Sequence, residues 1–180
     1  MISVCILTKN AASTLQATLE SVSTFPEVLL LDNGSTDETL RIGRTFANVR
    51  ICQTPFIGFG PLRNQAARIA QNDWIFALDS DEVVSPRLLE ELMRLKLDPS
   101  SAYAFPRHNF YKGKRIRGCG WDPEQVTRLY HRGKTCFSDA AVHESLVTNG
   151  LEVIGFKSPL LHTPYRSTAD FLAKMQHYST

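Results

Sequence analysis

The sequence predicts an α/β fold, a three-layer sandwich in which helices cover both faces of a mostly parallel sheet. Apolar runs of strand length alternate with helical patterns through the first half of the chain. The fourth run, at 74–78, holds consecutive apolar residues, as in a strand that is buried on both faces. Acids follow this run at once, at the strand end where open α/β sheets bind their ligands.

The first half carries four runs of strand length with three helical patterns between them. The predicted strands are at 2–8, 28–31, 49–53 and 74–78. Capping boxes at 13–16 and 35–38 predict the starts of two helices, and a third helix is expected at 61–71. Strands and helices in this alternating order are typical of a parallel sheet.

The second half is less regular. Ser85 and Pro86 have the residue types preferred at the N-cap and first position of a helix, which we expect to run to about residue 97. Short strands at 103–106 and 126–130 are predicted to form a smaller, mixed part of the same sheet.

Length and composition predict one domain spanning residues 1–180. With 180 residues and 43% hydrophobic side chains, the chain is long enough for one well-buried core and too short for two ordinary domains. A capping pattern and apolar residues at helical spacing predict a last helix at 167–180, whose apolar face needs a surface to dock on.

Charge and cysteine usage restrict the place of action and the partners. A net charge of +2 is too small to indicate a nucleic-acid partner. No two of the four cysteines have CxxC or zinc-ligand spacing, which fits a reducing compartment. No apolar run is long enough to span a bilayer. We therefore expect a cytoplasmic protein, at most peripheral to the inner face of a membrane.

Three acids end the fourth predicted strand: Asp79, Asp81 and Glu82. Acids this close repel one another unless a cation lies among them. Their oxygens suit Mg²⁺ or Mn²⁺, which complete their coordination with substrate phosphates and water. One interpretation is therefore a site for a metal and a diphosphate. The other is an acidic N-terminus for the helix that begins at Pro86.

Four short motifs, each at a predicted strand end or helix start, together resemble family 2 glycosyltransferases of the Rossmann-like GT-A fold. They are Thr-Lys-Asn at 8–10, Asp-Asn-Gly-Ser-Thr-Asp at 32–37, Gly-Pro-Leu-Arg-Asn at 60–64 and Asp-Ser-Asp-Glu at 79–82. Further segments are similar to the bacterial branch that includes lipopolysaccharide core glucosyltransferases, whose members are typically longer. They are Trp-Asp-Pro-Glu at 121–124, Arg-Leu-Tyr at 128–130, Val-His-Glu at 142–144, and His162.

The resemblance implies an inverting transfer of a sugar from a nucleotide-diphosphate donor, a UDP-sugar, with Mg²⁺ or Mn²⁺. The acceptor would be a glycan or a lipid-linked molecule of cell-envelope polysaccharide or lipopolysaccharide synthesis. Residues 1–97 would form the nucleotide-sugar-binding half and 98–166 the acceptor half, followed by the C-terminal helix at 167–180.

The resemblance also assigns residues to each part of the donor. Asp32 would accept a hydrogen bond from the uracil N3–H, with Thr8 and Asn10 beside it. The guanidinium of Arg63 suits a diphosphate, and Ser80 lies between the acids of the metal motif. Without the resemblance, we would expect Asp32 to be a turn residue and Arg63 to be a solvated charge on a helix.

The metal would be held by Asp79 and Asp81, and His162 or His143 would supply a further contact to the metal or the diphosphate. Bound there, it would stabilise the charge that develops on the leaving nucleotide. The alternative for either histidine is a structural role, which is the commoner one for a histidine seen alone.

The acceptor is expected at the basic segment 107–134, which has eight Lys or Arg residues against two acids. Aromatic residues interleave with this charge and can pack on sugar faces, while basic groups suit anionic glycans. Trp121 and Arg128 are the candidate acceptor contacts. A solvated surface, or contact with an anionic membrane, would explain the same composition.

An inverting transfer needs a carboxylate that takes the proton of the acceptor hydroxyl. Glu144 follows apolar residues whose burial would raise its pKa toward a useful range. Glu124, which stands where the related Trp-Pro-Asp segment has Asp, lies in a more basic setting. Glu144 is therefore placed ahead of Glu124, although an ion pair that orders the loop would also explain Glu144.

Two other classes of protein share parts of this pattern. An Asp-Ser-Asp sequence after an apolar strand also begins phosphatase sites of the haloacid dehalogenase type, but there the pair usually follows the first core strand. A nucleotide-sugar-binding module without catalytic activity is the stronger alternative, because 180 residues can lack part of an acceptor site.

Overall fold

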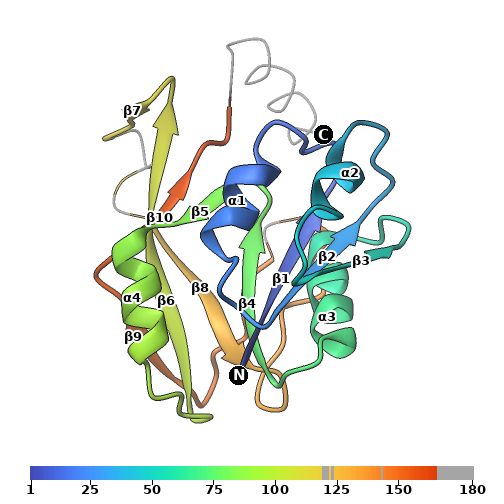
Figure 1. The fold of residues 1–180 in the computed structure, drawn as a ribbon. Helices are drawn as coiled ribbons and strands as arrows, with labels where there is room; N and C mark the ends of the chain where they lie inside the picture. Colours follow the sequence, from blue (N-terminus) through green and yellow to red (C-terminus); the bar gives the residue numbers. More distant parts are fainter. Residues whose placement is uncertain (119–121, 123, 143, 166–180) are drawn as a thin grey trace.

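The computed structural model describes residues 1–118, 122, 124–142 and 144–165. Within these residues ten strands form one curled sheet with the order β3-β2-β1-β4-β8-β6-β10-β5, and β7 and β9 pair with β6 (Figure 1). This mixed α/β architecture confirms the predicted fold class. The expected helix at 167–180 lies outside the described residues.

The first half of the sheet is parallel, as predicted. Its strands are β1 (Ile2–Thr8), β2 (Glu27–Asp32), β3 (Val49–Gln53) and β4 (Trp74–Asp79). The register pairs Thr8 with Asp32, Asp32 with Gln53, and Leu7 with Asp79. The carboxyl ends of all four strands, and the polar residues on them, therefore meet at one edge of the sheet.

The second half is mixed, as expected, but contains more strand than the sequence predicted. Its strands are β5 (Glu82–Val84), β6 (Ser101–Tyr111), β7 (Lys114–Arg115), β8 (Glu124–His131), β9 (Glu152–Gly155) and β10 (Leu160–His162). The strand expected at 103–106 continues well beyond Pro106. β8 runs antiparallel to both β4 and β6, and so joins the two halves into one sheet.

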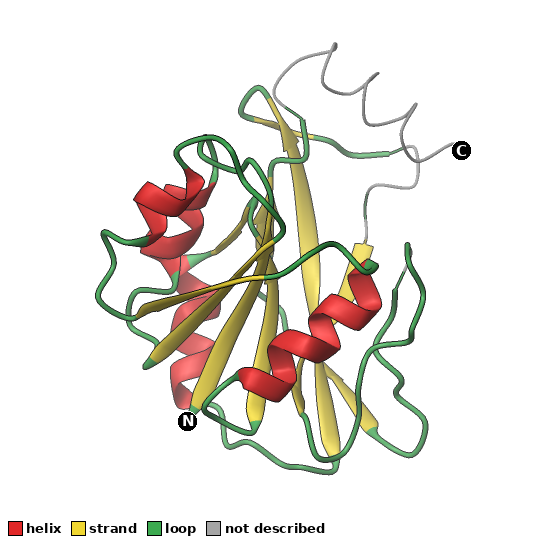
Figure 2. Ribbon diagram, turned by 90° about the vertical axis from the view of Figure 1, so that its right-hand side faces the viewer, coloured by secondary structure: helices red, strands yellow, loops and turns green. Residues whose placement is uncertain are grey.

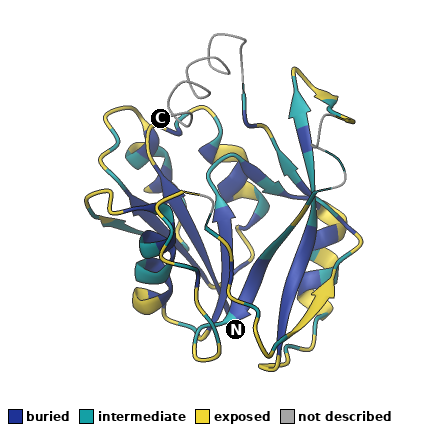
Figure 3. Ribbon diagram, turned by 180° about the vertical axis from the view of Figure 1, so that it is seen from behind, coloured by how far each residue is buried: buried dark blue, intermediate teal, exposed yellow. Residues whose placement is uncertain are grey.

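Helices and loops cover both faces of the sheet, which gives three layers (Figure 2). Helices α1 (Leu15–Ser21), α2 (Thr39–Gly43) and α4 (Pro86–Arg94) supply apolar side chains to one core. Helix α3 (Phe59–Ile69) covers the opposite face, with residues of the segment 137–151. Alternate residues of β1, β2 and β4 enter the two cores, so these strands are almost wholly buried (Figure 3).

Helix starts were predicted with mixed success. Ser85 caps α4 as expected, since its hydroxyl accepts a hydrogen bond from the Leu88 N–H at 3.3 Å, but α4 ends at Arg94. The two capping-box predictions were wrong, because neither helix has a side-chain cap of that kind. The hydroxyl of Ser35 instead donates to the Asp32 carboxylate. No helix in the described parts of the chain is long and apolar enough to cross a membrane.

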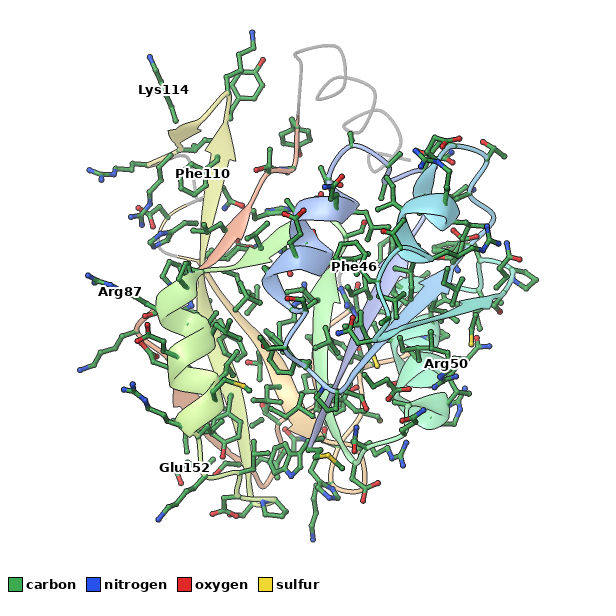
Figure 4. All side chains as sticks on the ribbon, viewed as in Figure 1. Phe46, Arg50, Arg87, Phe110, Lys114 and Glu152 are labelled. Carbon is green, nitrogen blue, oxygen red and sulfur yellow. The ribbon has the colours of Figure 1, made fainter. Side chains whose placement is uncertain are left out.

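A buried carboxylate at the start of β2 ties the amino-terminal edge of the sheet together. Glu27 is 3% exposed. It accepts hydrogen bonds from Ser3 Oγ at 2.5 Å, from the Gln71 N–H at 2.7 Å and from Arg50 Nη2 at 2.7 Å (Arg50 in Figure 4). Burial acts to raise the pKa of Glu27, but the hydrogen bonds from Ser3, Gln71 and Arg50 outweigh it and lower the pKa below 4.5.

We expect Glu27→Ala to lower the free energy of unfolding by about 3 kcal/mol at neutral pH, because several donors lose a shared buried acceptor. Urea denaturation measures this. Because the folded pKa of Glu27 is depressed, the stabilisation is present above pH 4.5 and is lost as the pH falls through the folded pKa. Glu38→Ala, which removes an exposed partner of Arg41, is the control and should change little. Equal effects of the two variants would contradict the role of Glu27.

Candidate active site

The ends of β1 and β2 place Thr8 and Asp32 side by side, with Gln53 of β3 next to Asp32. Asp32 is fully buried, and its carboxylate accepts hydrogen bonds from the backbone N–H groups of Gly34 (3.0 Å) and Ser35 (3.1 Å) and from Gln53 Nε2 (3.3 Å). The buried hydroxyl of Thr8 has no hydrogen-bond partner within the described chain. This edge therefore offers a fixed carboxylate beside an unused hydroxyl.

Asn10 connects the loops that follow β1 and β2. Its Oδ1 accepts a hydrogen bond from the Thr36 N–H at 2.8 Å, and its own N–H donates to Ser35 Oγ at 2.9 Å. The backbone φ of Asn10 is 52°, a left-handed conformation that Asn adopts more readily than most residues. Hydrogen bonds thus join the segments 8–10 and 32–37, which the sequence singled out separately, into one structural unit.

Asp79, at the end of β4, is surrounded by arginines. Arg63 Nη2 lies 2.6 Å from Asp79 Oδ1, while Arg128 Nη2 and Arg107 Nη1 lie 2.9 and 3.7 Å from Oδ2. Burial acts to raise the pKa of Asp79, but the charges of Arg128 and Arg63 hold it well below its usual range. Asp79 is therefore a carboxylate that neutralises buried guanidinium groups.

Glu82 belongs to the same cluster. Its side chain is fully buried, and it accepts hydrogen bonds from the Asp79 N–H at 3.0 Å and from Arg107 Nη1 at 3.2 Å. Burial, and then the charge of Asp79, raise the pKa of Glu82. The buried Glu82 side chain thus stabilises the turn after β4 through its hydrogen bond from the Asp79 N–H.

Arg63, on α3, bridges Asp79 to Glu144. Only 4% of its side chain is exposed, and its Nε lies 2.7 Å from Glu144 Oε1. The loop before Glu144 packs closely on α3, since a Cβ at Gly60 would lie 1.9 Å from the Ser138 carbonyl oxygen. Its carbonyl oxygens also accept hydrogen bonds from the first N–H groups of α3. The structure therefore places Arg63 between two carboxylates rather than on the surface.

Asp81 lies apart from this cluster, opposite His162 of β10. Its Oδ1 is 3.5 Å from His162 Nε2. Burial acts to lower the pKa of His162, but Asp81 and Glu82 outweigh it and raise the pKa. The Asp81 and His162 side chains are 23% and 12% exposed, so solvent reaches both. Ser80, between the acids, accepts a hydrogen bond from Thr18 Oγ1 through its backbone carbonyl.

This pair can form half of a divalent-metal site. In the part of the chain that the structure describes, no three or more His, Cys, Asp or Glu side chains form a closed metal cage. Mg²⁺ and Mn²⁺ do not need one, since they retain water and bind substrate phosphates. One carboxylate oxygen and one imidazole nitrogen, both partly exposed, fit such an ion, whereas Asp79 is occupied by arginines.

Glu124, the second base candidate, is held by Arg107. Arg107 donates from Nε at 3.0 Å and from Nη2 at 2.5 Å, and Asn109 Nδ2 donates at 3.1 Å. Burial acts to raise the pKa of Glu124, but the hydrogen bonds from Arg107 and Asn109 outweigh it and lower the pKa. Sequence reasoning missed both donors because the predicted strand ended at Pro106. Their alternate positions, 107 and 109, would have placed them on one face of a longer strand.

Of the two predicted acceptor contacts, the described part of the chain includes Arg128, and it is not at the surface. Arg128 is buried and directed at Asp79. Trp121 and the metal candidate His143 lie outside the described residues. Phe110 and Lys114 lie on the hairpin of β6 and β7, at the same end of the molecule as the carboxyl ends of the parallel strands (Figure 4).

The curled mixed sheet, with polar side chains gathered at the carboxyl ends of its parallel strands, matches solved glycosyltransferases of the GT-A fold. The chain belongs to glycosyltransferase family 2: the family model described as "Glycosyl transferase family 2" matches residues 3–140.

Relatives with curated descriptions agree with this family. An uncharacterized glycosyltransferase of Rickettsia prowazekii is 28% identical over 82% of this chain. The lipopolysaccharide core biosynthesis glycosyltransferase LpsC of Rhizobium meliloti is 26% identical over 99% of this chain. The chain spans 53% of the first relative and 69% of the second.

Solved structures share the fold at low sequence identity. The mannosyltransferase PcManGT of Pyrobaculum calidifontis, in complex with GDP-Man and Mn²⁺, has a TM-score of 0.68 and 17% identity, over 98% of this chain and 61% of that one. TarS of S. aureus (residues 1–349), in complex with UDP-GlcNAc, has a TM-score of 0.66 and 20% identity, over 94% of this chain and 60% of that one.

The two acids of the Asp-Ser-Asp motif should differ sharply in their contribution to stability. Asp79→Asn leaves Arg63 and Arg128 buried with less compensating charge, so we expect the free energy of unfolding to fall by about 3 kcal/mol. Asp81→Asn changes a partly exposed group and should cost less than about 1 kcal/mol. Urea denaturation of both variants without metal measures the difference. Equal losses would contradict the separation of the two acids.

Proposed function

We propose that this chain carries the donor and catalytic sites of an inverting glycosyltransferase that moves a sugar from a UDP-sugar to a glycan or lipid-linked acceptor. The proposal rests on two sets of side chains that have different partners at the same edge of the sheet. Asp81 and His162 form a partly exposed pair of metal ligands, while Asp79 and Glu144 are held by Arg63. Family membership supports the class of reaction.

The uracil base would bind at the ends of β1 and β2. Asp32 has the oxygen that the uracil N3–H needs, and two backbone N–H groups hold its carboxylate still. Thr8 contributes a hydroxyl without a partner in the described chain, and Asn10 orders the loop beside it. A buried carboxylate that accepts from N3–H distinguishes uracil from cytosine, which has no hydrogen at that position.

Asp81 and His162 would hold Mn²⁺ or Mg²⁺, whose remaining positions water and the donor diphosphate would fill. When bound, the metal neutralises the diphosphate and stabilises the charge on the leaving nucleotide. The complex of the fold neighbour PcManGT with GDP-Man and Mn²⁺ supports this choice of metal. Ser80, between the two acids of the motif, would contact the nucleotide-sugar donor.

Asp79 and Arg63 would hold other groups of the site in place. Arg63 holds Asp79 and Glu144 on one buried guanidinium, so the acid at the end of β4 and the candidate base keep a fixed separation. Arg128 and Arg107 extend the positive charge around Asp79. A diphosphate bound near this edge would be attracted by these guanidinium groups, since they bind oxyanions in a defined geometry.

Glu144 remains the preferred base. Among the described residues its ion-pair partner is Arg63. Glu124 is instead bound by two nitrogens of Arg107 and has a lowered pKa, which weakens it as a base. In the proposed step, the Glu144 carboxylate takes the acceptor hydroxyl proton while the acceptor oxygen attacks the anomeric carbon. The nucleotide leaves from the opposite face, and the configuration inverts.

The acceptor would approach along the basic segment 107–134, over the hairpin of β6 and β7. Lys114 and the aromatic Phe110 lie there and suit an anionic glycan. The similarity to LpsC supports an acceptor of lipopolysaccharide synthesis. Free cysteines in the described chain support a reducing, cytoplasmic site of action.

Metal-dependent donor binding is the first test. A panel of nucleotide sugars, and UDP itself, is compared by thermal shift with Mn²⁺ and with EDTA, since a ligand specific for the folded state raises its apparent stability. We expect the UDP shift to require Mn²⁺ and to disappear in Asp81→Asn. An unchanged shift in that variant would make the metal assignment wrong.

The base is tested by release of UDP from the nucleotide sugar that gives the largest shift. Glu144→Gln keeps the shape and an acceptor for Arg63, so donor binding should survive while turnover falls about 10²–10⁴-fold. If Glu144→Gln turns over normally and Glu124→Gln does not, the base is Glu124. Donor binding by the unmodified chain without any turnover would favour the non-catalytic module.

A further inference from the structure

Asn109, near the end of β6, connects the proposed metal ligand to the charged cluster. It is 1% exposed and is the register partner of His162 in the parallel pairing of β6 with β10. Its Oδ1 lies 2.6 Å from His162 Nδ1, and its Nδ2 lies 3.1 Å from Glu124 Oε2. One buried amide therefore contacts His162 on one side and Glu124 on the other.

The charge on Glu124 fixes which way this amide faces. Arg107 donates two hydrogen bonds to Glu124, and so holds it as a carboxylate that can only accept. The Asn109 group that faces Glu124 must then be the NH₂ donor, and the group that faces His162 must be the carbonyl acceptor. His162 therefore carries a proton on Nδ1 and donates it to Asn109 Oδ1.

In the neutral imidazole only one ring nitrogen carries a proton, so a proton on Nδ1 leaves a lone pair on Nε2. Nε2 is also the nitrogen that faces Asp81 Oδ1, at 3.5 Å. The hydrogen bond to Asn109 thus directs the metal-binding nitrogen of His162 toward the other proposed ligand.

We propose that Asn109 is a positioning residue that sets the tautomer and the ring orientation of His162 for metal binding. The inference rests on the proposed function, in which Asp81 and His162 hold the metal. In the proposed site Asn109 would bind neither the sugar donor nor the metal itself, and would act through its hydrogen bond to His162. Partners of this kind typically contribute about 10–100-fold to metal affinity.

The tautomer can be measured without metal and without any variant. In protein labelled with ¹⁵N-histidine, at a pH where His162 is neutral, the ring ¹⁵N shifts should show a protonated Nδ1 and an unprotonated Nε2. The signal is assigned by its loss in His162→Gln. A protonated Nε2 would overturn the proposal.

Metal affinity tests the consequence. Mn²⁺ binding in the presence of UDP is measured by the decrease of the free Mn²⁺ signal in electron paramagnetic resonance. Asn109→Leu, which keeps the volume but removes the acceptor, should weaken Mn²⁺ about 10–100-fold. Asn48→Ala, which removes an amide from the opposite end of the sheet, should not. Equal Mn²⁺ affinity in Asn109→Leu and the unmodified protein would overturn the proposal.

A swap of the two polar groups provides the rescue. Asn109→Asp with Glu124→Gln keeps an acceptor for His162 and a donor between positions 109 and 124, so Mn²⁺ affinity should recover most of the loss. If the unmodified protein shows the expected tautomer but binds no Mn²⁺ with UDP, the proposed function fails and the orientation by Asn109 stands. If Asp81→Asn abolishes Mn²⁺ binding and Asn109→Leu leaves it unchanged, the proposed metal site stands and the positioning role of Asn109 fails.

Discussion

The buried guanidinium of Arg63 is the group on which this site depends. A cation with 4% of its side chain exposed is stable only when anions and hydrogen-bond acceptors surround it, and Asp79 and Glu144 supply them from two distant parts of the chain. The same requirement brings the loop before Glu144 onto α3, where Gly60 leaves room for the backbone at Ser138. One electrostatic constraint therefore joins the carboxyl end of β4 to the loop that carries the candidate base.

Charge balance then separates the two acids of the Asp-Ser-Asp motif. Asp79 is occupied by arginines, while Asp81, two residues later, faces His162. The cluster around Asp79 also includes Arg107, which contacts Glu82 and Glu124. An extended network of this kind resists local rearrangement, because removing one member leaves another buried charge unpaired. It gives the more exposed pair a rigid support, which suits a site that must present ligands in a fixed geometry.

Much of this arrangement could be predicted from local sequence. The consecutive apolar residues of β4 indicated a strand buried on both faces, and Ser85 before Pro86 indicated a helix start, because both signals act over a few residues. The paired charges could not be predicted in this way. From local sequence Arg63 is expected to be a solvated charge on a helix, and its burial depends on the distant segment 138–141, which packs on α3. The role of Asn109 was missed because the predicted strand ended at Pro106. That proline removes one backbone donor, and β6 nevertheless continues against β8.

The separate roles of Asp79 and Asp81 can be tested by a crystal structure with UDP and Mn²⁺ in which the anomalous signal of manganese is recorded. We expect one manganese peak, bound by an Asp81 carboxylate oxygen and by His162 Nε2, with Arg63 still between Asp79 and Glu144. A manganese ion bound by Asp79, with Arg63 turned away from that carboxylate and onto the diphosphate, would show that the two roles are wrongly assigned.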